Sequence, residues 1–265
     1  MNNNTRFELS FKNISQLEKK LNFCKLNNIK NINIPCKGLI KKELFNSTIN
    51  YISKNFHELN VTYHYSLYHQ YSKNKNNSYQ NFLDFIKNSH TNRNYEILLV
   101  SGSNKKKNFE SIDALAYLQK EKNLKVKLGI AYNPYLKKYY KVNSERERFE
   151  RKISTGLINS IWFQYGTDIK VLQNELTYVK NVAKEEKLNL FGSLFIPSKQ
   201  FIARFKFRPW KEVYISEKCL YDFENFFDFT NDLVCFYKEN NITPLIESDF
   251  SSSEKLDSVY GFLEK

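Results

Sequence analysis

Eight short apolar runs recur along the chain, and a longer stretch with helical periodicity separates each run from the next. The runs are rich in β-branched and aromatic residues, which favour strands. We predict strands at RFEL (Arg6–Leu9), NINIP (Asn31–Pro35), LNVTYHY (Leu59–Tyr65), EILLV (Glu96–Val100), VKLGIAY (Val126–Tyr132), SIWFQY (Ser160–Tyr165), LNLFGSLF (Leu188–Phe195) and ITPLIE (Ile242–Glu247).

The stretches between these runs carry apolar residues three and four positions apart, as on one face of a helix; Phe82, Phe85 and Ile86 are an example. We predict helices at Ile14–Leu26, Asn81–Ser89, Ile112–Glu121, Arg146–Ser154, Val171–Glu186 and Tyr221–Asn240. The polar stretch Tyr71–Gln80 is expected to be a surface loop. Strands that alternate with helices of this length indicate βαβ units and a parallel sheet.

The number of βαβ units favours a closed sheet. A (β/α)8 TIM barrel needs about 250 residues, and this chain has 265. No G-x-G-x-x-G motif follows any predicted strand, so a Rossmann-type dinucleotide site has no support. Nothing in the composition marks a linker. We therefore predict an α/β protein with a single (β/α)8 barrel domain over residues 1–265.

The cellular setting follows from what the sequence lacks. No apolar run approaches the roughly 20 residues of a membrane span, and the N-terminus lacks the basic-then-apolar pattern of a signal peptide. Cys24, Cys36, Cys219 and Cys235 are widely spaced, without a CxxC pair. We interpret them as buried thiols in a reducing cytoplasm, not as disulfides or metal ligands.

The net charge admits two interpretations. With 41 basic and 28 acidic side chains the formal net charge is +13, and such a charge is typical of nucleic-acid binding. The chain is also saturated with Asn, Lys, Ile, Tyr and Phe, the residues that AT-rich codons supply. Because the basic residues are scattered and no recognition helix is apparent, we expect no nucleic-acid partner. A positive field would still attract anionic ligands. A homo-oligomer is one assembly that the sequence allows.

Polar residues at strand ends are the first candidates for a site, because the active site of a (β/α)8 barrel lies at the C-terminal ends of its strands. This rule selects Glu8, His64, Ser101 to Ser103, Tyr132 and Gln164. A carboxylate that faces the barrel interior, as Glu8 would, can serve as a general acid. The alternative is a strand-end glutamate paired with a lysine.

The other candidates also have two interpretations each. His64 could bind a cofactor or be a satisfied structural residue. The loop Ser101–Lys107, with three lysines, could bind an anion or be solvated. Arg148, Arg151 and Lys152 lie three and four positions apart and could clamp a pyrophosphate. Alternating Glu and Arg on this helix could equally form intrahelical ion pairs.

Five segments, taken in order, resemble methylenetetrahydrofolate reductase along nearly the whole chain. RFELSF is similar to the F-E-F-F-P pattern of that family's first strand, VTYHYSL to a strand that ends in H-L-T-C, and GIAYNPY to A-A-Y-P. FERKISTGLINSIWFQYGTD is similar to L-K-R-K-x-x-A-G-A-x-x-x-I-T-Q-F-F-F-D. FGSLFIPSKQFIARFKF is similar to the P-G-I-L-P strand and the helix after it.

The resemblance implies an enzyme of one-carbon metabolism that passes hydride from NAD(P)H through FAD to 5,10-methylenetetrahydrofolate, giving 5-methyltetrahydrofolate. It implies that Glu8 is the acid that opens the methylene bridge. The cofactor-binding residues would be His64, Ser101, Gly102, Ser103, Tyr132, Arg148, Arg151 and Lys152. The folate-binding residues would be Gln164, Gln200 and Phe207. No metal is implied.

The chain also departs from that family's pattern. Ser101-Gly102-Ser103 stands where the family has R-G-D, Ala203 stands where it has a glutamine (Gln200 is close by), and PLIES (Pro244–Ser248) replaces T-L-N-R. An alternative function is therefore a folate- or flavin-binding barrel relative with lost or altered one-carbon chemistry.

Overall fold

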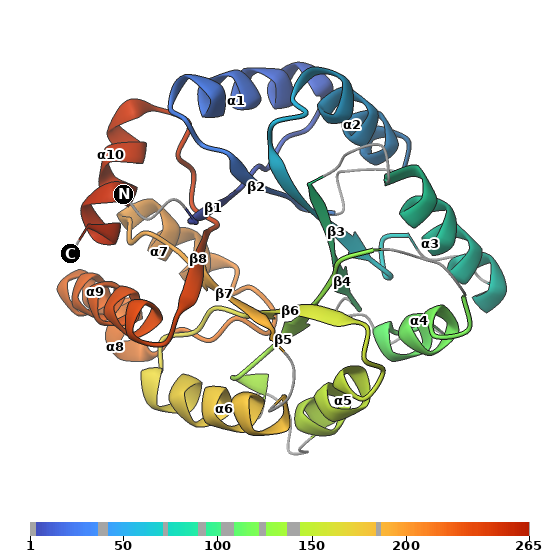
Figure 1. The fold of residues 1–265 in the computed structure, drawn as a ribbon. Coiled ribbons are helices and arrows are strands. Elements are labelled where there is room, and N and C mark those ends of the chain that lie inside the picture. Colours follow the sequence, from blue (N-terminus) through green and yellow to red (C-terminus); the bar gives the residue numbers. More distant parts are fainter. Residues whose placement is uncertain are drawn as a thin grey trace. The chain divides into compact units, whose positions relative to one another are not determined.

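The strands form a closed parallel barrel in the order of the chain, from β1 to β8 (Figure 1). The computed structural model describes residues 4–36, 42–70, 74–89, 94–101, 109–121, 126–136, 144–183 and 187–264. The strands are β1 (Arg6–Glu8), β2 (Asn31–Ile34), β3 (Asn60–Ser66), β4 (Tyr95–Val100), β5 (Leu128–Tyr132), β6 (Ile158–Phe163), β7 (Asn189–Leu194) and β8 (Ile242–Ile246). The predicted α/β class and (β/α)8 barrel are confirmed.

Helices alternate with the strands along the chain. They are α1 (Ile14–Leu26), α2 (Lys42–Asn55), α3 (Lys75–Ser89), α4 (Ser111–Leu118), α5 (Ser144–Ile153), α6 (Ile169–Val182), α7 (Lys199–Phe207), α8 (Glu217–Tyr221), α9 (Phe223–Glu239) and α10 (Ser253–Leu263). Among the described residues, no helix is long and apolar enough to cross a membrane.

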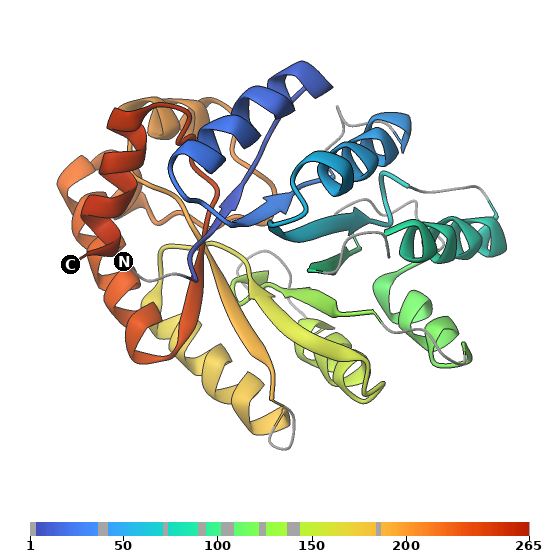
Figure 2. The same cartoon turned by 45° about the horizontal axis from the view of Figure 1, so that its top comes forward.

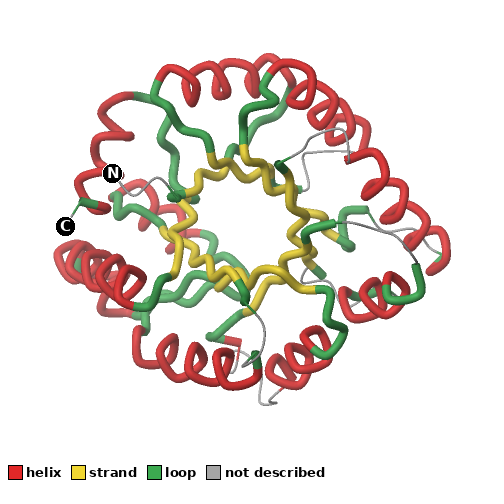
Figure 3. The backbone as a smooth tube through the Cα atoms, in the orientation of Figure 1, coloured by secondary structure: helices red, strands yellow, loops and turns green. Residues whose placement is uncertain are grey.

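The chain packs as two compact units. The N-terminal unit comprises Arg6–Ile130 and Arg151–Asn159, and the C-terminal unit comprises Met1–Thr5, Ala131–Glu150 and Ser160–Lys265. In the N-terminal unit, α1 to α4 lie on one side of β1 to β4 (Figures 2 and 3). The single domain over residues 1–265 stays a prediction.

Aromatic side chains on β3 show which way that strand faces. Tyr65 contacts Phe82 and Phe85 of α3, with ring centroids 4.9 and 4.7 Å apart, and Tyr63 contacts Phe45 of α2 at 6.1 Å. Tyr63 and Tyr65 therefore point toward the helices. Because successive side chains of a strand alternate between its two faces, His64 points to the opposite face, the inner face of the sheet.

In the C-terminal unit, β7 and α9 pack at a distance that requires glycine. A Cβ atom on Gly192 would lie 2.3 Å from Cζ of Tyr237, closer than van der Waals contact allows. The Tyr237 hydroxyl donates to the backbone oxygen of Ser193 at 2.9 Å. On the other face of β7, Phe191 stacks on Trp162 of β6 with a centroid separation of 3.9 Å.

Several helices begin at a side chain that accepts a hydrogen bond from a backbone N–H of the first turn, as helix N-caps do. Asn13, Asp168, Ser198 and Ser252 play this role for α1, α6, α7 and α10. Asp222 ends α8 and also caps α9, where it accepts from Glu224 N at 3.0 Å and Asn225 N at 3.4 Å. The helix predicted at Tyr221–Asn240 corresponds to α9, whereas the short helix α8 before it is an element that the apolar pattern does not predict.

The surface loop predicted at Tyr71–Gln80 is also wrong in part, because α3 begins at Lys75. The side chain of Asn74 accepts from the N–H of Asn76 at 2.8 Å and starts the helix early. Lys75 pairs with Asp113 of α4 at 2.8 Å. Residues 71–73 lie outside the described part of the chain.

All four cysteines are free thiols, and they differ in burial. Cys24, Cys36 and Cys219 are buried as predicted, and burial raises the pKa of Cys24 to about 12 and also raises that of Cys36. Cys235 is exposed, so the prediction is wrong there: it lies on the outer face of α9, while Val234 and Phe236 beside it are buried. No group of metal-ligating side chains occurs among the described residues.

Candidate functional site

The inner face of the N-terminal unit carries a cluster of polar side chains, called here the inner polar cluster, made of Arg6 and Glu8 of β1, Asn33 of β2 and His64 of β3. Glu8 is the last residue of β1 and pairs in register with Asn33 of β2. Oε2 of Glu8 lies 3.9 Å from Nδ1 of His64. Both side chains are buried, with 3% of Glu8 and 13% of His64 exposed. The structure thus brings together two residues that the strand-end rule selects independently.

Asn33 joins the histidine to Arg6. The amide Nδ2 of Asn33 lies 2.8 Å from Nε2 of His64, and its Oδ1 accepts from Nε of Arg6 at 2.7 Å. Asn33 is fully buried. The four side chains therefore form a continuous polar chain, and the sequence analysis identified neither Arg6 nor Asn33 as part of a site.

Arg6 is a buried cation held from several sides. Its Nη2 donates to the backbone oxygens of Ile32 at 2.7 Å and Asn60 at 3.0 Å. Burial lowers the pKa of Arg6 to about 10, and the carboxylate of Glu96 on β4 acts in the opposite direction. A buried charge is costly unless it is paired and hydrogen-bonded, and these bonds supply that compensation.

Ser101, the residue after β4, contacts the start of α4. Its hydroxyl lies 2.7 Å from that of Ser111 and accepts from the backbone N–H of Ser111 at 3.1 Å. These bonds attach the end of β4 to the next helix. Gly102 and Ser103, expected beside it in the cofactor site, lie outside the described residues.

In the C-terminal unit, Gln164 follows the end of β6. Its backbone N–H donates to the oxygen of Tyr132 at 2.9 Å, and its side-chain oxygen accepts from the N–H of Tyr165 at 2.9 Å. A second polar pair joins β7 to the end of β8: the hydroxyl of Ser193, within β7, donates to Glu247, the residue after β8. The strand-end rule does not select this pair, although Glu247 ends the predicted strand Ile242–Glu247.

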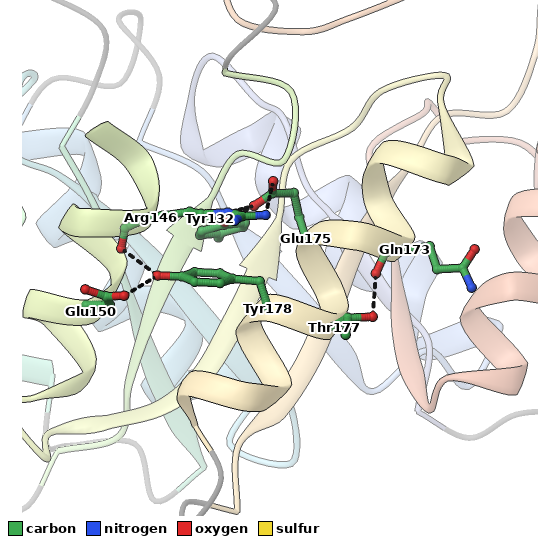
Figure 4. A network of polar contacts seen from close by, with 7 residues as sticks. All are labelled: Tyr132, Arg146, Glu150, Gln173, Glu175, Thr177 and Tyr178. Atoms are coloured by element: carbon green, nitrogen blue, oxygen red, sulfur yellow. Dashed lines mark hydrogen bonds and ion pairs between the residues drawn. The ribbon is translucent and has the colours of Figure 1, made fainter. Parts of the chain in front are cut away.

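Tyr132 lies in a polar network between β5 and the helices α5 and α6 (Figure 4). Its hydroxyl donates to Oε2 of Glu175, and Arg146 donates to both oxygens of Glu175 at 2.9 and 3.0 Å. The guanidinium lies 4.2 Å from the ring centroid of Tyr178, whose hydroxyl donates to Glu150 at 2.6 Å.

The contacts of Tyr132 show which way its side chain points. The side chain is 1% exposed, and its ring packs edge-on against Phe149 of α5 at 5.1 Å. Burial, followed by the hydrogen bond to Glu175, raises the pKa of Tyr132. The side chain therefore points toward the helices, and its role in binding a cofactor stays a prediction.

The three basic candidates on α5, which are Arg148, Arg151 and Lys152, do not form one surface. Nη1 of Arg148 lies 3.6 Å from Glu145 Oε2, the intrahelical ion pair considered as the alternative. Arg151 is exposed, whereas Lys152 is 4% exposed. Their spacing suggested a shared helix face, but consecutive residues are about 100° apart around a helix, so Arg151 and Lys152 have different surroundings.

The two candidates on α7 are both exposed. Gln200 lies in its first turn, and Phe207 at its last position is 92% exposed. The aromatic contacts of this region are made instead by Phe201 and Phe205, which pack with Trp210 at 5.4 and 6.2 Å.

Four of the residues expected to hold FAD make contacts within the protein. His64 is engaged in the inner polar cluster, Ser101 binds Ser111, and Tyr132 binds Glu175. Arg148 pairs within its own helix. Gly102 and Ser103 lie outside the described residues, so the FAD site stays a prediction.

No family model matches the chain, and no curated protein matches it. In fold, the chain is similar to an uncharacterized protein from Clostridium thermocellum that binds two copies of 5-methyl-5,6,7,8-tetrahydrofolic acid; the TM-score is 0.59 and the identity 12%, over 98% of this chain and 93% of that chain. It is also similar to active domain 2 of a thermostable chitinase from Pyrococcus furiosus, with a TM-score of 0.55 and 12% identity over 92% of this chain and 83% of that chain. Likeness at such identities shows the fold alone.

Proposed function

We propose that this barrel binds a reduced folate, with the pterin ring at the inner polar cluster. The observation that carries the proposal is the buried carboxylate of Glu8, at the end of β1 and 3.9 Å from the imidazole of His64. The likeness in fold to a protein that binds 5-methyltetrahydrofolate supports it.

Glu8 suits a pterin because of its hydrogen-bonding type. A carboxylate accepts hydrogen bonds through both oxygens, and the pterin ring offers two adjacent donors, its N3–H and its 2-amino group. Paired bonds to a carboxylate give orientation as well as affinity. The position at a strand end is where ligands of (β/α)8 barrels bind.

A second candidate function is the reductase that the sequence resemblance implies, in which Glu8 is the acid. Glu8 would give its proton to N10 of 5,10-methylenetetrahydrofolate as the bond between N10 and the methylene carbon breaks. The carbon is then an N5 iminium, and hydride from NAD(P)H would reduce it to the methyl group. The burial of Glu8 at a strand end favours this role. No step is assigned to a flavin.

The binding proposal is tested by calorimetry with 5-methyltetrahydrofolate. Glu8→Gln removes a charged acceptor, and such hydrogen bonds contribute about 1.5–3 kcal/mol, so we expect binding to weaken by about 10- to 100-fold. Glu58→Gln is the matched control, because Glu58 is exposed and precedes β3. It therefore lies away from the C-terminal ends of the strands. Equal affinities of the wild type and Glu8→Gln would rule out the proposed site.

The reductase proposal needs a separate measurement. Oxidation of NAD(P)H would be followed with 5,10-methylenetetrahydrofolate, with and without added FAD, together with the visible spectrum of the purified protein. Turnover that is lost in Glu8→Gln supports the acid role. Tight binding of the folate without turnover in any condition favours the alternative, a folate-binding relative without reductase activity.

A further inference from the structure

The starting point is the direction of the hydrogen bond between Arg6 and Asn33. A guanidinium has N–H donors and no acceptor, so the Asn33 atom that lies 2.7 Å from Nε of Arg6 must be an oxygen. The flipped amide would bring two donors together inside a buried site. The orientation of this amide, often ambiguous in proteins, is therefore fixed here by chemistry.

The fixed amide in turn decides the protonation of His64. The Asn33 nitrogen Nδ2 can only donate, and it lies 2.8 Å from Nε2 of His64. Nε2 must then accept, so it carries no proton. A neutral imidazole has one N–H, which must be on Nδ1.

The remaining N–H of His64 faces the carboxylate. Nδ1 lies 3.9 Å from Oε2 of Glu8, and a carboxylate can accept this proton. In the opposite tautomer a lone pair on Nδ1 would face the negatively charged oxygen, which is repulsive. The tautomer required by Asn33 is thus also the one that suits Glu8.

The guanidinium of Arg6 is held firmly enough to fix the orientation of the Asn33 amide and, through it, the tautomer of His64. Its bonds to the backbone oxygens of Ile32 and Asn60, on two neighbouring strands, fix the guanidinium independently of Asn33. Glu96 lies on the next strand and keeps an opposite charge near it.

We propose that Arg6 and Asn33 are positioning residues that hold His64 as the neutral tautomer with its proton on Nδ1, directed at Glu8. They act through His64 and need not touch a ligand. The extension to ligand binding rests on the proposed function: a carboxylate oriented by His64 is ready to accept the donors of a pterin.

The protonation state is measured directly by NMR of the intact protein labelled with ¹⁵N-histidine. The chain has four histidines, and comparison with His64→Gln assigns the ring of interest. We expect Nδ1 of His64 at the chemical shift of a protonated nitrogen and Nε2 at that of an unprotonated one. A protonated Nε2 in the wild type would overturn the proposal.

Asn33→Asp, a nearly isosteric change, tests whether the hydrogen bond from Asn33 to His64 sets the tautomer of the imidazole. Aspartate accepts from Arg6 and also from His64, so Nε2 should become protonated and its resonance should move accordingly. Asn31→Asp is the matched control: it adds the same charge on the same strand, where Asn31 already accepts from Asn60 Nδ2 at 2.9 Å, and it should leave His64 unchanged. An unchanged Nε2 in Asn33→Asp would contradict the proposal.

Calorimetry separates this inference from the proposed function. We expect Asn33→Asp to weaken binding of 5-methyltetrahydrofolate by about 10-fold, the effect of one charged hydrogen bond, and Asn31→Asp to leave it unchanged. If the wild type shows the expected tautomer but does not bind the folate, the positioning role stands and the proposed function falls. Wild-type affinity in an Asn33→Asp variant with protonated Nε2 would overturn the extension to the ligand.

Discussion

At the scale of single residues, Glu175 is the acceptor around which its neighbours are arranged. It is 6% exposed, and its two oxygens accept from the Tyr132 hydroxyl and from two nitrogens of Arg146. The guanidinium and the carboxylate match as a paired fork, which is the strongest arrangement of such groups. This network joins the end of β5 to α5 and α6.

Glu175→Gln should destabilise the protein by about 1–3 kcal/mol, because it removes the charge and replaces one acceptor oxygen with a donor beside buried donors. Urea denaturation measures the change. Glu147→Gln, on the exposed side of α5, is the control and should change stability by less than about 0.5 kcal/mol. Equal midpoints for the two variants would show that the network does not stabilise the fold.

Sequence reasoning reaches part of the candidate site. The strand-end rule selects Glu8 and His64 because position along a strand can be inferred from the apolar pattern. It does not identify Asn33, which lies inside a predicted strand with nothing to distinguish it. It does not show that Tyr132 points toward the helices, since that contact involves Glu175, which is 43 residues away.

At the scale of elements, two glycines in regular structure have opposite surroundings. Gly192 of β7 lies against the ring of Tyr237 on α9, whereas a Cβ atom on Gly261 of α10 would meet nothing within 4 Å. One glycine is required by the packing of a strand on a helix. The other only reduces the stability of its helix, because glycine is a poor helix former.

Gly192→Ala should therefore destabilise the protein by about 1–3 kcal/mol, the usual effect of forcing an extra group into a packed core. Gly261→Ala should stabilise it by about 0.5–1 kcal/mol. Both are measured by urea denaturation, and each variant serves as the control for the other. Two changes of the same sign would contradict this account of the packing.

The element boundaries show where a single sequence is ambiguous. The short helix α8 is not predicted, because its five residues are too few to show a periodic apolar pattern. Asp222 ends α8 and caps α9, so the hydrogen bonds of this aspartate separate the two helices. The start of α3 was missed for a related reason: its first turn is polar and is stabilised by Asn74 and by Lys75 with Asp113.

At the scale of the whole molecule, tyrosine burial is the dominant ionisation effect at alkaline pH. Burial raises the pKa of five tyrosines in the core: Tyr65, Tyr132, Tyr135, Tyr165 and Tyr237. In the unfolded chain these groups ionise near pH 10, while in the folded chain they remain protonated. The stability they contribute is complete below pH 10 and is lost as the pH rises above it.

We expect the free energy of unfolding to fall steeply above pH 10, by about 1.4 kcal/mol for each such tyrosine by pH 11. Arg6, whose pKa burial lowers to about 10, acts in the opposite direction and offsets about one of them. Urea denaturation at pH 8, 10 and 11 measures the loss. Tyr165→Phe should make the fall shallower, because it removes one of these ionisable groups. The Tyr165 hydroxyl has no hydrogen-bond partner among the described residues, so the substitution breaks no hydrogen bond there. A stability independent of pH in this range would exclude the effect.

The fold as a whole is predictable from the sequence because the same pattern, an apolar strand followed by a helical stretch, is repeated along the chain. Eight strand runs separated by helical stretches specify a (β/α)8 barrel even when individual boundaries are wrong by a few residues. The function is less predictable, because it depends on a few side chains whose directions are set by contacts across the strands.

The uneven burial of the cysteines provides a way to observe the molecule opening. Because Cys235 alone among the four is exposed, a thiol reagent should modify the native chain rapidly at one position. The other three should react only when the strands and helices that cover them separate, so the rate of their slower labelling would report how often that separation occurs. A fast reaction at all four positions would show that the core opens far more readily than its burial implies.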